Sequence, residues 1–130
     1  MMRKAFIVLY LACLTAFSAG SAGAVTYAYI PSVPGSGDGN VVRINTADET
    51  FTTVNFGNDP YGVAVSPQGD YLVVTRPSAN SVTLVRTGSF ASTSAQVLRD
   101  VGTEPRGVAV ESQGNYAYVA NYGSGTVSEI

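Results

Sequence analysis

The chain has 130 residues, with seven lysines and arginines, nine acidic residues and no histidine. This length suits one ordinary domain, and the part after residue 24 carries five arginines, no lysine, no cysteine and a net charge of −4. That composition disfavours zinc, haem and iron–sulfur sites, histidine-based nucleophilic catalysis, P-loop phosphate binding and nucleic-acid binding. We therefore assign no catalytic, cofactor-binding or metal-binding residue.

The first 24 residues have the three parts of a bacterial-type secretory signal peptide. Met1 to Lys4 is a short positive start, Ala5 to Phe17 is apolar, and Ala22-Gly23-Ala24 offers the small residues that a signal peptidase accepts. The apolar run has 13 residues, fewer than the ~20 that span a bilayer, which disfavours an uncleaved membrane anchor. We predict cleavage between Ala24 and Val25 and a secreted, periplasmic or cell-surface protein that does not span the membrane.

The rest of the chain contains a repeat with a spacing of 45 residues. Gly57 to Val65 (GNDPYGVAV) recurs as Gly102 to Val110 (GTEPRGVAV), and eleven of the 29 positions from Gly57 to Val85 are identical in the second copy. A period of about 40–45 residues built from short strands is typical of propeller blades.

A weaker third copy lies upstream. In it Tyr27 to Ile30 (YAYI) matches Tyr116 to Val119 (YAYV), and Val41 to Ile44 (VVRI) matches Val127 to Ile130 (VSEI). Because tyrosines recur at equivalent strand positions, we expect them to pack between neighbouring repeat units: Tyr27, Tyr29, Tyr71, Tyr116 and Tyr118.

Each copy favours short β-strands separated by tight turns, and no segment after Phe17 has a helical period. The strand segments are rich in aromatic and β-branched residues, several of them alternating with polar ones. Gln68-Gly69-Asp70 and Gln113-Gly114-Asn115 have the composition of hairpin turns, in which glycine supplies a positive φ. In chain order the predicted strands are Thr26–Ile30, Val41–Ile44, Phe51–Phe56, Gly62–Ser66, Tyr71–Thr75, Ser81–Val85, Ala95–Val101, Gly107–Glu111, Tyr116–Ala120 and Thr126–Ile130.

These residues resemble the YVTN-type β-propeller repeat of bacterial and archaeal surface-layer and other secreted proteins. Pro60 to Gly69 follows the family's Pro-x-Gly-Val-Ala-Val-Ser-Pro-x-Gly block, and Tyr118 to Asn121 (YVAN) corresponds to its Tyr-Val-Thr-Asn tetrad. Ser124 to Ser128 matches the last block, whereas the preceding tetrad has drifted to Val73–Arg76 and Glu111-Ser112 replaces Ser-Pro. The resemblance implies an all-β fold of four-stranded antiparallel propeller blades, an architecture that hosts binding, scaffolding and enzymatic roles alike.

We divide the chain into a signal peptide, residues 1–24, and a partial β-propeller, residues 25–130, of about two and a half blades (25–56, 57–101 and 102–130). The ten predicted strands give three, four and three strands to these blades, whereas a closed propeller has at least about four blades. Uncovered blade faces and open sheet edges favour association. We therefore expect an N-terminal fragment of a longer propeller, whose ten strands are not stable alone; assembly of several copies into one ring is the alternative.

Three residues are candidates for a surface contact. Tyr61 and Arg106 occupy the variable position between Pro and Gly in an otherwise constant frame, and such positions often face the functional surface of a repeat protein. Asp38 lies in the long Gly/Ser-rich connection from Pro31 to Asn40. The one adjacent pair of carboxylates, Asp48-Glu49, lies in a polar connection and is expected to form a solvated turn.

From these features we expect a non-catalytic, extracytoplasmic binding or scaffold module without a cofactor, whose partner is a protein or a component of the cell envelope. The alternative is a fragment of a lactonase-like or dehydrogenase-associated propeller enzyme, because the YVTN-type repeat is similar to the repeats of those proteins. Under that interpretation the catalytic residues lie in further blades. A structural role in a surface layer is a third hypothesis.

Overall fold

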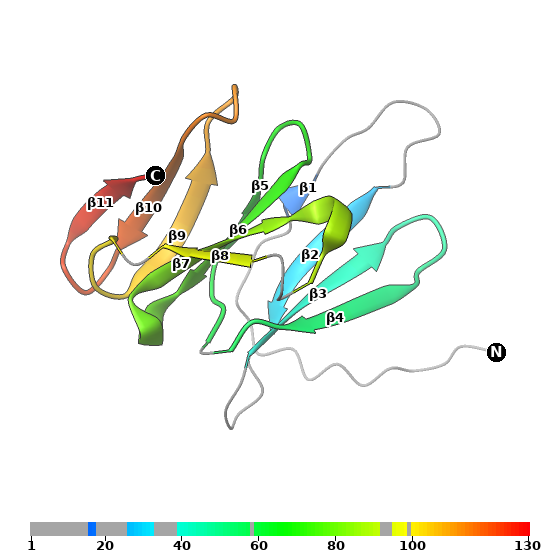
Figure 1. Cartoon of the computed structure of the whole chain (residues 1–130), viewed down its shortest axis with the longest axis horizontal. Helices are drawn as coiled ribbons and strands as arrows, with labels where there is room; N and C mark the ends of the chain where they lie inside the picture. The colour runs from blue at the N-terminus through cyan, green and yellow to red at the C-terminus, as the bar shows by residue number, and fades with distance from the viewer. Residues whose placement is uncertain (1–15, 18–25, 33–38, 58, 92–94, 99) are drawn as a thin grey trace.

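The computed structural model of the chain describes residues 16–17, 26–32, 39–57, 59–91, 95–98 and 100–130, which form three antiparallel sheets (Figure 1). Sheet A contains β1 (Ala16–Phe17), β2 (Tyr27–Ser32), β3 (Asn40–Asn45) and β4 (Phe51–Asn55). Sheet B contains β5 (Val63–Val65), β6 (Tyr71–Arg76), β7 (Ser81–Arg86) and β8 (Ala95–Leu98). Sheet C contains β9 (Pro105–Val110), β10 (Ala117–Asn121) and β11 (Thr126–Glu129). Two single 3₁₀ turns, η1 (Pro77–Ala79) and η2 (Thr87–Ser89), flank β7.

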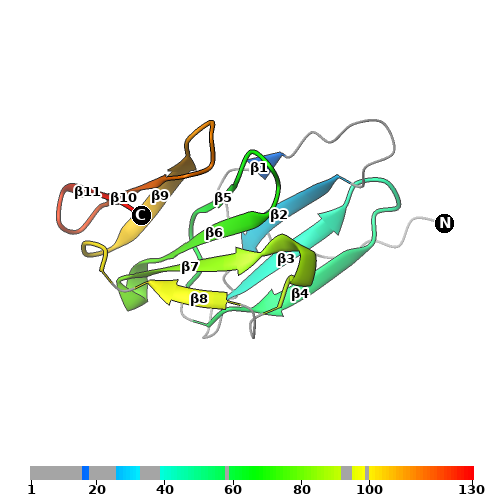
Figure 2. The same ribbon diagram turned by 45° about the horizontal axis from the view of Figure 1, so that its top comes forward.

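The all-β prediction is confirmed, and all ten predicted strands are present with ends shifted by up to three residues. In each sheet the strands pair in chain order, as expected when short turns join neighbours. Sheet B lies between sheets A and C (Figure 2). Among the described residues, no helix is long and apolar enough to cross a bilayer.

Sheet A has four strands where the sequence predicted three. The additional strand, β1, lies inside the predicted signal peptide and pairs antiparallel with β2, with Ala16 opposite Tyr29 and Phe17 opposite Ala28. It takes the position next to β2 that β5 has next to β6 and β9 has next to β10. The pairing satisfies backbone groups on an edge of β2 that the predicted three-stranded unit leaves open. The predicted cleavage site, Ala24–Val25, lies outside the described residues.

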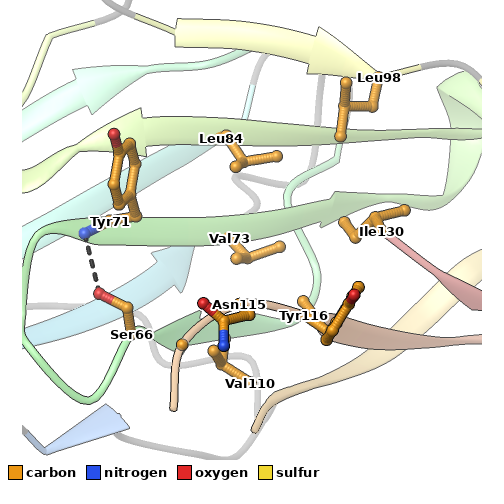
Figure 3. Close-up of a pocket in the computed structure, with 11 residues that line it drawn as sticks. Ser66, Tyr71, Val73, Leu84, Leu98, Val110, Asn115, Tyr116 and Ile130 are labelled. Atoms are coloured by element: carbon orange, nitrogen blue, oxygen red, sulfur yellow. Dashed lines mark hydrogen bonds between the residues drawn. The ribbon is translucent and has the colours of Figure 1, made fainter.

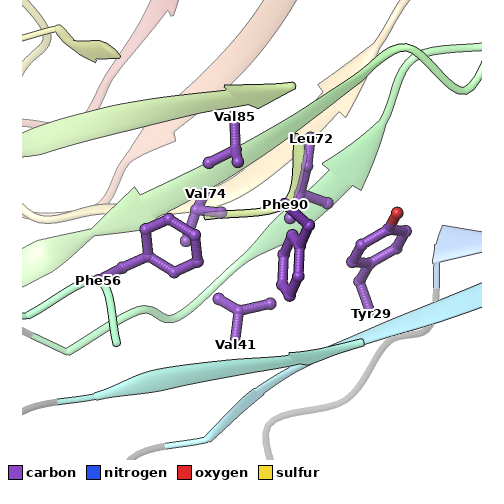
Figure 4. Packing of buried hydrophobic residues seen from close by; sticks show 7 residues of the cluster. All are labelled: Tyr29, Val41, Phe56, Leu72, Val74, Val85 and Phe90. Atoms are coloured by element: carbon purple, nitrogen blue, oxygen red, sulfur yellow. The ribbon is translucent and has the colours of Figure 1, made fainter. Parts of the chain in front are cut away.

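The first hydrophobic core lies between sheets A and B (Figure 4). Aromatic rings fill its centre: the ring centroid of Phe90 is 5.4 Å from that of Tyr29, edge to face, and 6.0 Å from that of Phe56. Such tilted ring pairs stabilise a core beyond the area that they bury. Aliphatic side chains from both sheets surround the rings: Val41 from β3, Leu72 and Val74 from β6, and Val85 from β7.

A second core lies between sheets B and C. Val73 and Val82 of sheet B pack there with Ala117 and Val119 of sheet C. Because successive residues of a strand point to opposite faces, Val73 faces sheet C while its neighbour Leu72 faces sheet A. Sheet B is therefore covered on both faces, which explains why four consecutive residues of β6, Leu72 to Thr75, are buried.

The two predicted hairpin turns are confirmed. Gly69 and Gly114 have φ values of 77° and 78°, a region that favours glycine. The turns also contact each other, because the side-chain amide of Gln68 donates a hydrogen bond to the backbone carbonyl of Gln113 at 2.9 Å. This contact joins two positions 45 residues apart, one repeat period.

The prediction that the recurring tyrosines pack between repeat units is confirmed for Tyr29 and for the half-buried Tyr27, which packs against the same core, and it is wrong for the three others. Tyr71 and Tyr116 lie at or beside the first residue of their strands and are exposed. Tyr118 is exposed because it lies on the face of sheet C that points away from sheet B. Burial at these positions thus depends on the neighbouring sheet as well as on the residue.

Candidate functional site

Two Pro-x-Gly loops, one just before β5 and one at the start of β9, are preceded by residues that share an unusual backbone conformation. Asp59 and Glu104, which precede the prolines, have φ values of 42° and 49°. A non-glycine residue in this left-handed region costs about 1 kcal/mol or more, and it persists where the surroundings hold it. The prolines that follow, Pro60 and Pro105, are fully buried and anchor both loops.

Thr75 of β6 joins the two loops. Its hydroxyl accepts a hydrogen bond from the N–H of Gly62 at 2.8 Å and donates one to the carbonyl of Arg106 at 2.7 Å. The loops approach so closely that a Cβ atom at Gly62 would lie 2.2 Å from the Arg106 carbonyl oxygen. Gly62 is therefore required by packing between repeats, and the contact places Tyr61 and Arg106 side by side.

Arg106 is the centre of an exposed cluster, here called the Tyr–Arg surface, formed by Tyr61, Glu104, Arg106 and Tyr122. Its guanidinium carbon lies 3.8 Å from the ring centroid of Tyr122 and 5.7 Å from that of Tyr61. One guanidinium nitrogen forms an ion pair with the Glu104 carboxylate at 3.0 Å. Both tyrosines are exposed. A cation–π contact at such a site contributes ~0.5–1 kcal/mol, so the side chains are held in place without being buried.

The chemistry of the Tyr–Arg surface suits recognition. The Glu104 carboxylate balances the charge of Arg106, so the cluster presents two aromatic rings and a planar guanidinium with little net charge. Tyrosine and arginine are enriched in protein interfaces because they combine a large contact area with hydrogen-bond donors. Among the described residues, no group of three or more His, Cys, Asp or Glu side chains is placed to hold a metal ion.

The structure brings together two of the three predicted contact residues, Tyr61 and Arg106, while Asp38 lies outside the described residues. Sequence reasoning missed Glu104 and Tyr122. Their positions follow from antiparallel pairing, because the end of β10 lies beside the start of β9, and the Tyr122 N–H donates to the Glu104 carbonyl at 2.9 Å. The predicted hairpin turn at Gln113–Asn115 was the available signal, because strands that pair on both sides of it bring Tyr122 close to Glu104.

A second feature is an apolar cleft of about 190 Å³ between sheets B and C (Figure 3). Leu84 of β7 and Leu98 of β8 line it from sheet B, and Val110 and Ile130 line it from sheet C. At one end the Ser66 hydroxyl accepts a hydrogen bond from the Tyr71 N–H at 3.1 Å. Among the described residues, the side chains that line the cleft are apolar or uncharged.

The carboxylate pair Asp48-Glu49 lies in the exposed turn between β3 and β4, as predicted. The hydroxyl and the N–H of Thr50 donate to the Asp48 carboxylate at 2.6 and 2.9 Å. These bonds hold the pKa of Asp48 below its ordinary value because they favour the ionised form. The carboxylate therefore stabilises its own turn.

Comparison with known proteins shows the fold alone. No protein-family model and no curated protein matches the sequence. Among solved structures, the chain is similar to hydrazine synthase from Kuenenia stuttgartiensis, with a TM-score of 0.62 and 21% sequence identity over 82% of this chain. This chain covers 41% of the length of that protein chain.

Proposed function

We propose that the chain is a secreted β-propeller repeat protein whose three sheets are successive blades, and that it acts as a non-catalytic binding or scaffold module outside the cytoplasm. Three observations support the propeller. Each copy of the repeat corresponds to one sheet, the sheets follow one another in chain order, and sheet B packs against both of its neighbours. The signal-peptide pattern of residues 1–24 supports export from the cytoplasm.

The Tyr–Arg surface is the observation on which the binding role rests. Tyr61 and Arg106 come from the variable position of two repeats, and the Thr75 hydrogen bonds hold their loops at a fixed spacing. Repeat proteins bind partners by burying the residues that are constant between repeats and by presenting the variable residues together on one surface. Because Glu104 balances Arg106, the surface favours a partner rich in aromatic, amide or hydroxyl groups, as in a protein or a cell-envelope component.

The binding role is tested by co-sedimentation of the purified protein with the envelope fraction of the organism that produces it. We expect Arg106→Ala and Tyr122→Ala to weaken retention about tenfold, the equivalent of about 1.4 kcal/mol. The matched control is Arg86→Ala, because Arg86 also lies over a tyrosine ring, 5.4 Å from the centroid of Tyr71, at the other end of sheet B. Equal retention of all three variants would argue against the Tyr–Arg surface.

An enzymatic role is tested separately. The structural neighbour named above is an enzyme, but at 21% identity the likeness extends to the fold and not to a reaction. Sustained hydrolysis of a lactone by the full-length protein, lost when carboxylates that line a propeller channel are replaced, would contradict the non-catalytic role.

A further inference from the structure

Two hydroxyl groups on β7 are buried between sheets A and B and have no hydrogen-bond partner among the described residues. They belong to Ser81 and Thr83, each of which is 1% exposed. Both side chains point toward sheet A, because Val82 between them packs in the core shared with sheet C. Burial of a hydroxyl without a hydrogen bond is unfavourable, so buried polar groups nearly always have a protein or water partner.

Sheet C shows how the repeat provides partners for the same two positions. Thr126 and Ser128 of β11 follow Ser81 and Thr83 by one repeat period. The side-chain amide of Asn121 donates a hydrogen bond to each of these hydroxyls, at 3.1 Å to Thr126 and at 2.9 Å to Ser128. A single buried amide group thus serves both hydroxyls of the following strand.

Sheet B carries an arginine at the position of this asparagine. Arg76, one repeat period before Asn121, lies at the end of β6 and directly opposite Ser81 in the strand pairing. Its longer side chain extends to the loop before β5, where a Cβ atom at Gly57 would lie 3.4 Å from a guanidinium nitrogen. The exchange of asparagine for arginine therefore removes the short amide that joins the two hydroxyls in sheet C.

The loop also packs less tightly on the strand in sheet B. At Gly102 a Cβ atom would lie 2.8 Å from the Cβ and Cγ atoms of Asn121, whereas at the equivalent Gly57 the nearest described atom is the Arg76 nitrogen at 3.4 Å. The Gly102 N–H donates to a strand hydroxyl of sheet C at 3.4 Å, but the Gly57 N–H donates to the side chain of Asn55 at 2.7 Å. Sheet B therefore has more room beside hydroxyls that neither the amide nor the loop serves.

We propose that an ordered water molecule binds between the hydroxyls of Ser81 and Thr83, at the position that the Asn121 amide takes in sheet C. Alternate residues of a strand lie on one face, so one water molecule can bond to both side chains. Buried waters make about three hydrogen bonds to polar groups, and the guanidinium of Arg76 brings further donors to this face. The proposal uses contacts within sheets B and C and does not rest on the proposed function.

The first test counts the long-lived water molecules of the full chain by oxygen-17 magnetic relaxation dispersion, which is insensitive to exchanging hydroxyl protons. We expect the wild type to hold one such water more than Thr83→Val, which lacks one of the two hydroxyls. Arg76→Asn should also lose this water, because the amide then serves both hydroxyls as in sheet C. Thr53→Val is the matched control, since Thr53 is an exposed strand threonine on β4, and should leave the count unchanged.

Urea unfolding distinguishes a bound water from hydroxyls that are buried dry. Thr83→Val keeps the shape of the side chain and removes only the hydroxyl. If that hydroxyl bonds to a water molecule, its loss should lower the midpoint of unfolding. If the hydroxyl is dry, the substitution removes an unpaired polar group from the interior and should raise the midpoint instead. We expect the lower midpoint, and the same direction for Ser81→Ala.

A wild-type chain with no more long-lived waters than Thr83→Val overturns the proposal, and so does a raised midpoint of unfolding in that variant. A water count in Arg76→Asn equal to that of the wild type overturns the exchange of an amide for a water molecule between the two sheets. Circular dichroism of each variant establishes that it has folded. If Thr83→Val does not fold, Ser81→Ala removes the other hydroxyl and provides the same comparison.

Discussion

Sheets B and C are built from copies of the same repeat and differ in what covers them. In β6, four consecutive residues from Leu72 to Thr75 are buried, whereas β10 alternates between buried and exposed residues along its whole length. Strand geometry is the same in both, since the side chains point alternately to the two faces. The repeat sequence therefore determines where a strand forms, whereas burial of the strand's second face requires a neighbouring sheet on that side.

The polar contacts differ between the sheets for the same reason. Thr75 is buried and bonds to both loops, whereas its equivalent in sheet C, Ala120, has no hydroxyl and is exposed. The following stability and titration experiments test this comparison at equivalent positions of the repeat.

The largest contrast is expected at the loop glycines. Gly62→Ala should lower the free energy of unfolding by about 3 kcal/mol, because the new methyl group meets the Arg106 carbonyl and the Thr75 hydroxyl. Gly107→Ala should leave it within about 0.5 kcal/mol, since the added group has room. Chemical denaturation of both variants measures the difference. Equal losses would contradict the close approach of the two loops.

The next contrast compares two valines at the same repeat position. Val82→Ala removes buried methyl groups from the core between sheets B and C and should cost about 2 kcal/mol. Val127→Ala should cost less than about 0.5 kcal/mol, because its side chain is exposed. Thermal and urea unfolding check both values. A large loss in Val127→Ala would mean that this face is covered within a single chain.

A smaller effect is expected from the hydroxyl that links the loops. Thr75→Val keeps the shape of the side chain but removes the partner of the Gly62 N–H and the Arg106 carbonyl, which should cost about 1.5 kcal/mol. Ala120→Val is the control at the equivalent exposed position and should change stability by less than about 0.5 kcal/mol. A stability of Thr75→Val equal to that of the wild type would show that the two hydrogen bonds contribute nothing net.

The smallest effect concerns two tyrosines at equivalent positions. Burial raises the pKa of Tyr29 above its ordinary value, whereas the hydrogen bond to Glu129, followed by its charge, raises the pKa of Tyr118. Glu129→Gln should therefore lower the pKa of Tyr118 and leave that of Tyr29 unchanged, as measured by NMR titration of the rings. An equal shift of both tyrosines would contradict these separate causes.

The sign of the stability effect follows from the direction of the Tyr29 shift. The folded chain holds the Tyr29 proton more tightly than the unfolded chain does. The contribution of the protonated Tyr29 side chain to the free energy of unfolding is therefore complete below the unfolded pKa of about 10. It is lost as the pH rises through the higher pKa of the folded chain. Stability that rose over this alkaline range would be the contrary result.

Much of the fold was predictable, since its determinants are local. Hairpin turns with glycine at positive φ, as at Gly69 and Gly114, and runs of β-branched residues depend on neighbours in the chain. Two of the four residues of the Tyr–Arg surface could be predicted from the sequence. Tyr61 and Arg106 were selected as variable positions in a constant frame, but Tyr122 joins them through the register of β9 and β10. That register is a property of the folded sheet.

The errors also have a physical cause. Tyr71, Tyr116 and Tyr118 share a repeat pattern with buried Tyr29, and pattern alone cannot distinguish a covered face from an open one. Strand β1 was missed because its residues have the composition of a signal peptide, and its pairing with β2 is a non-local contact.

The amino-acid sequence determines the repeat period, the strands and the turns of this protein, because these depend on backbone preferences over a few residues. Tertiary structure decides which faces are buried, why Gly62 must be glycine, and which side chains meet at Arg106. Those properties arise where segments about 45 residues apart come within van der Waals or hydrogen-bonding distance. Only the packing of one sheet on the next brings those segments together.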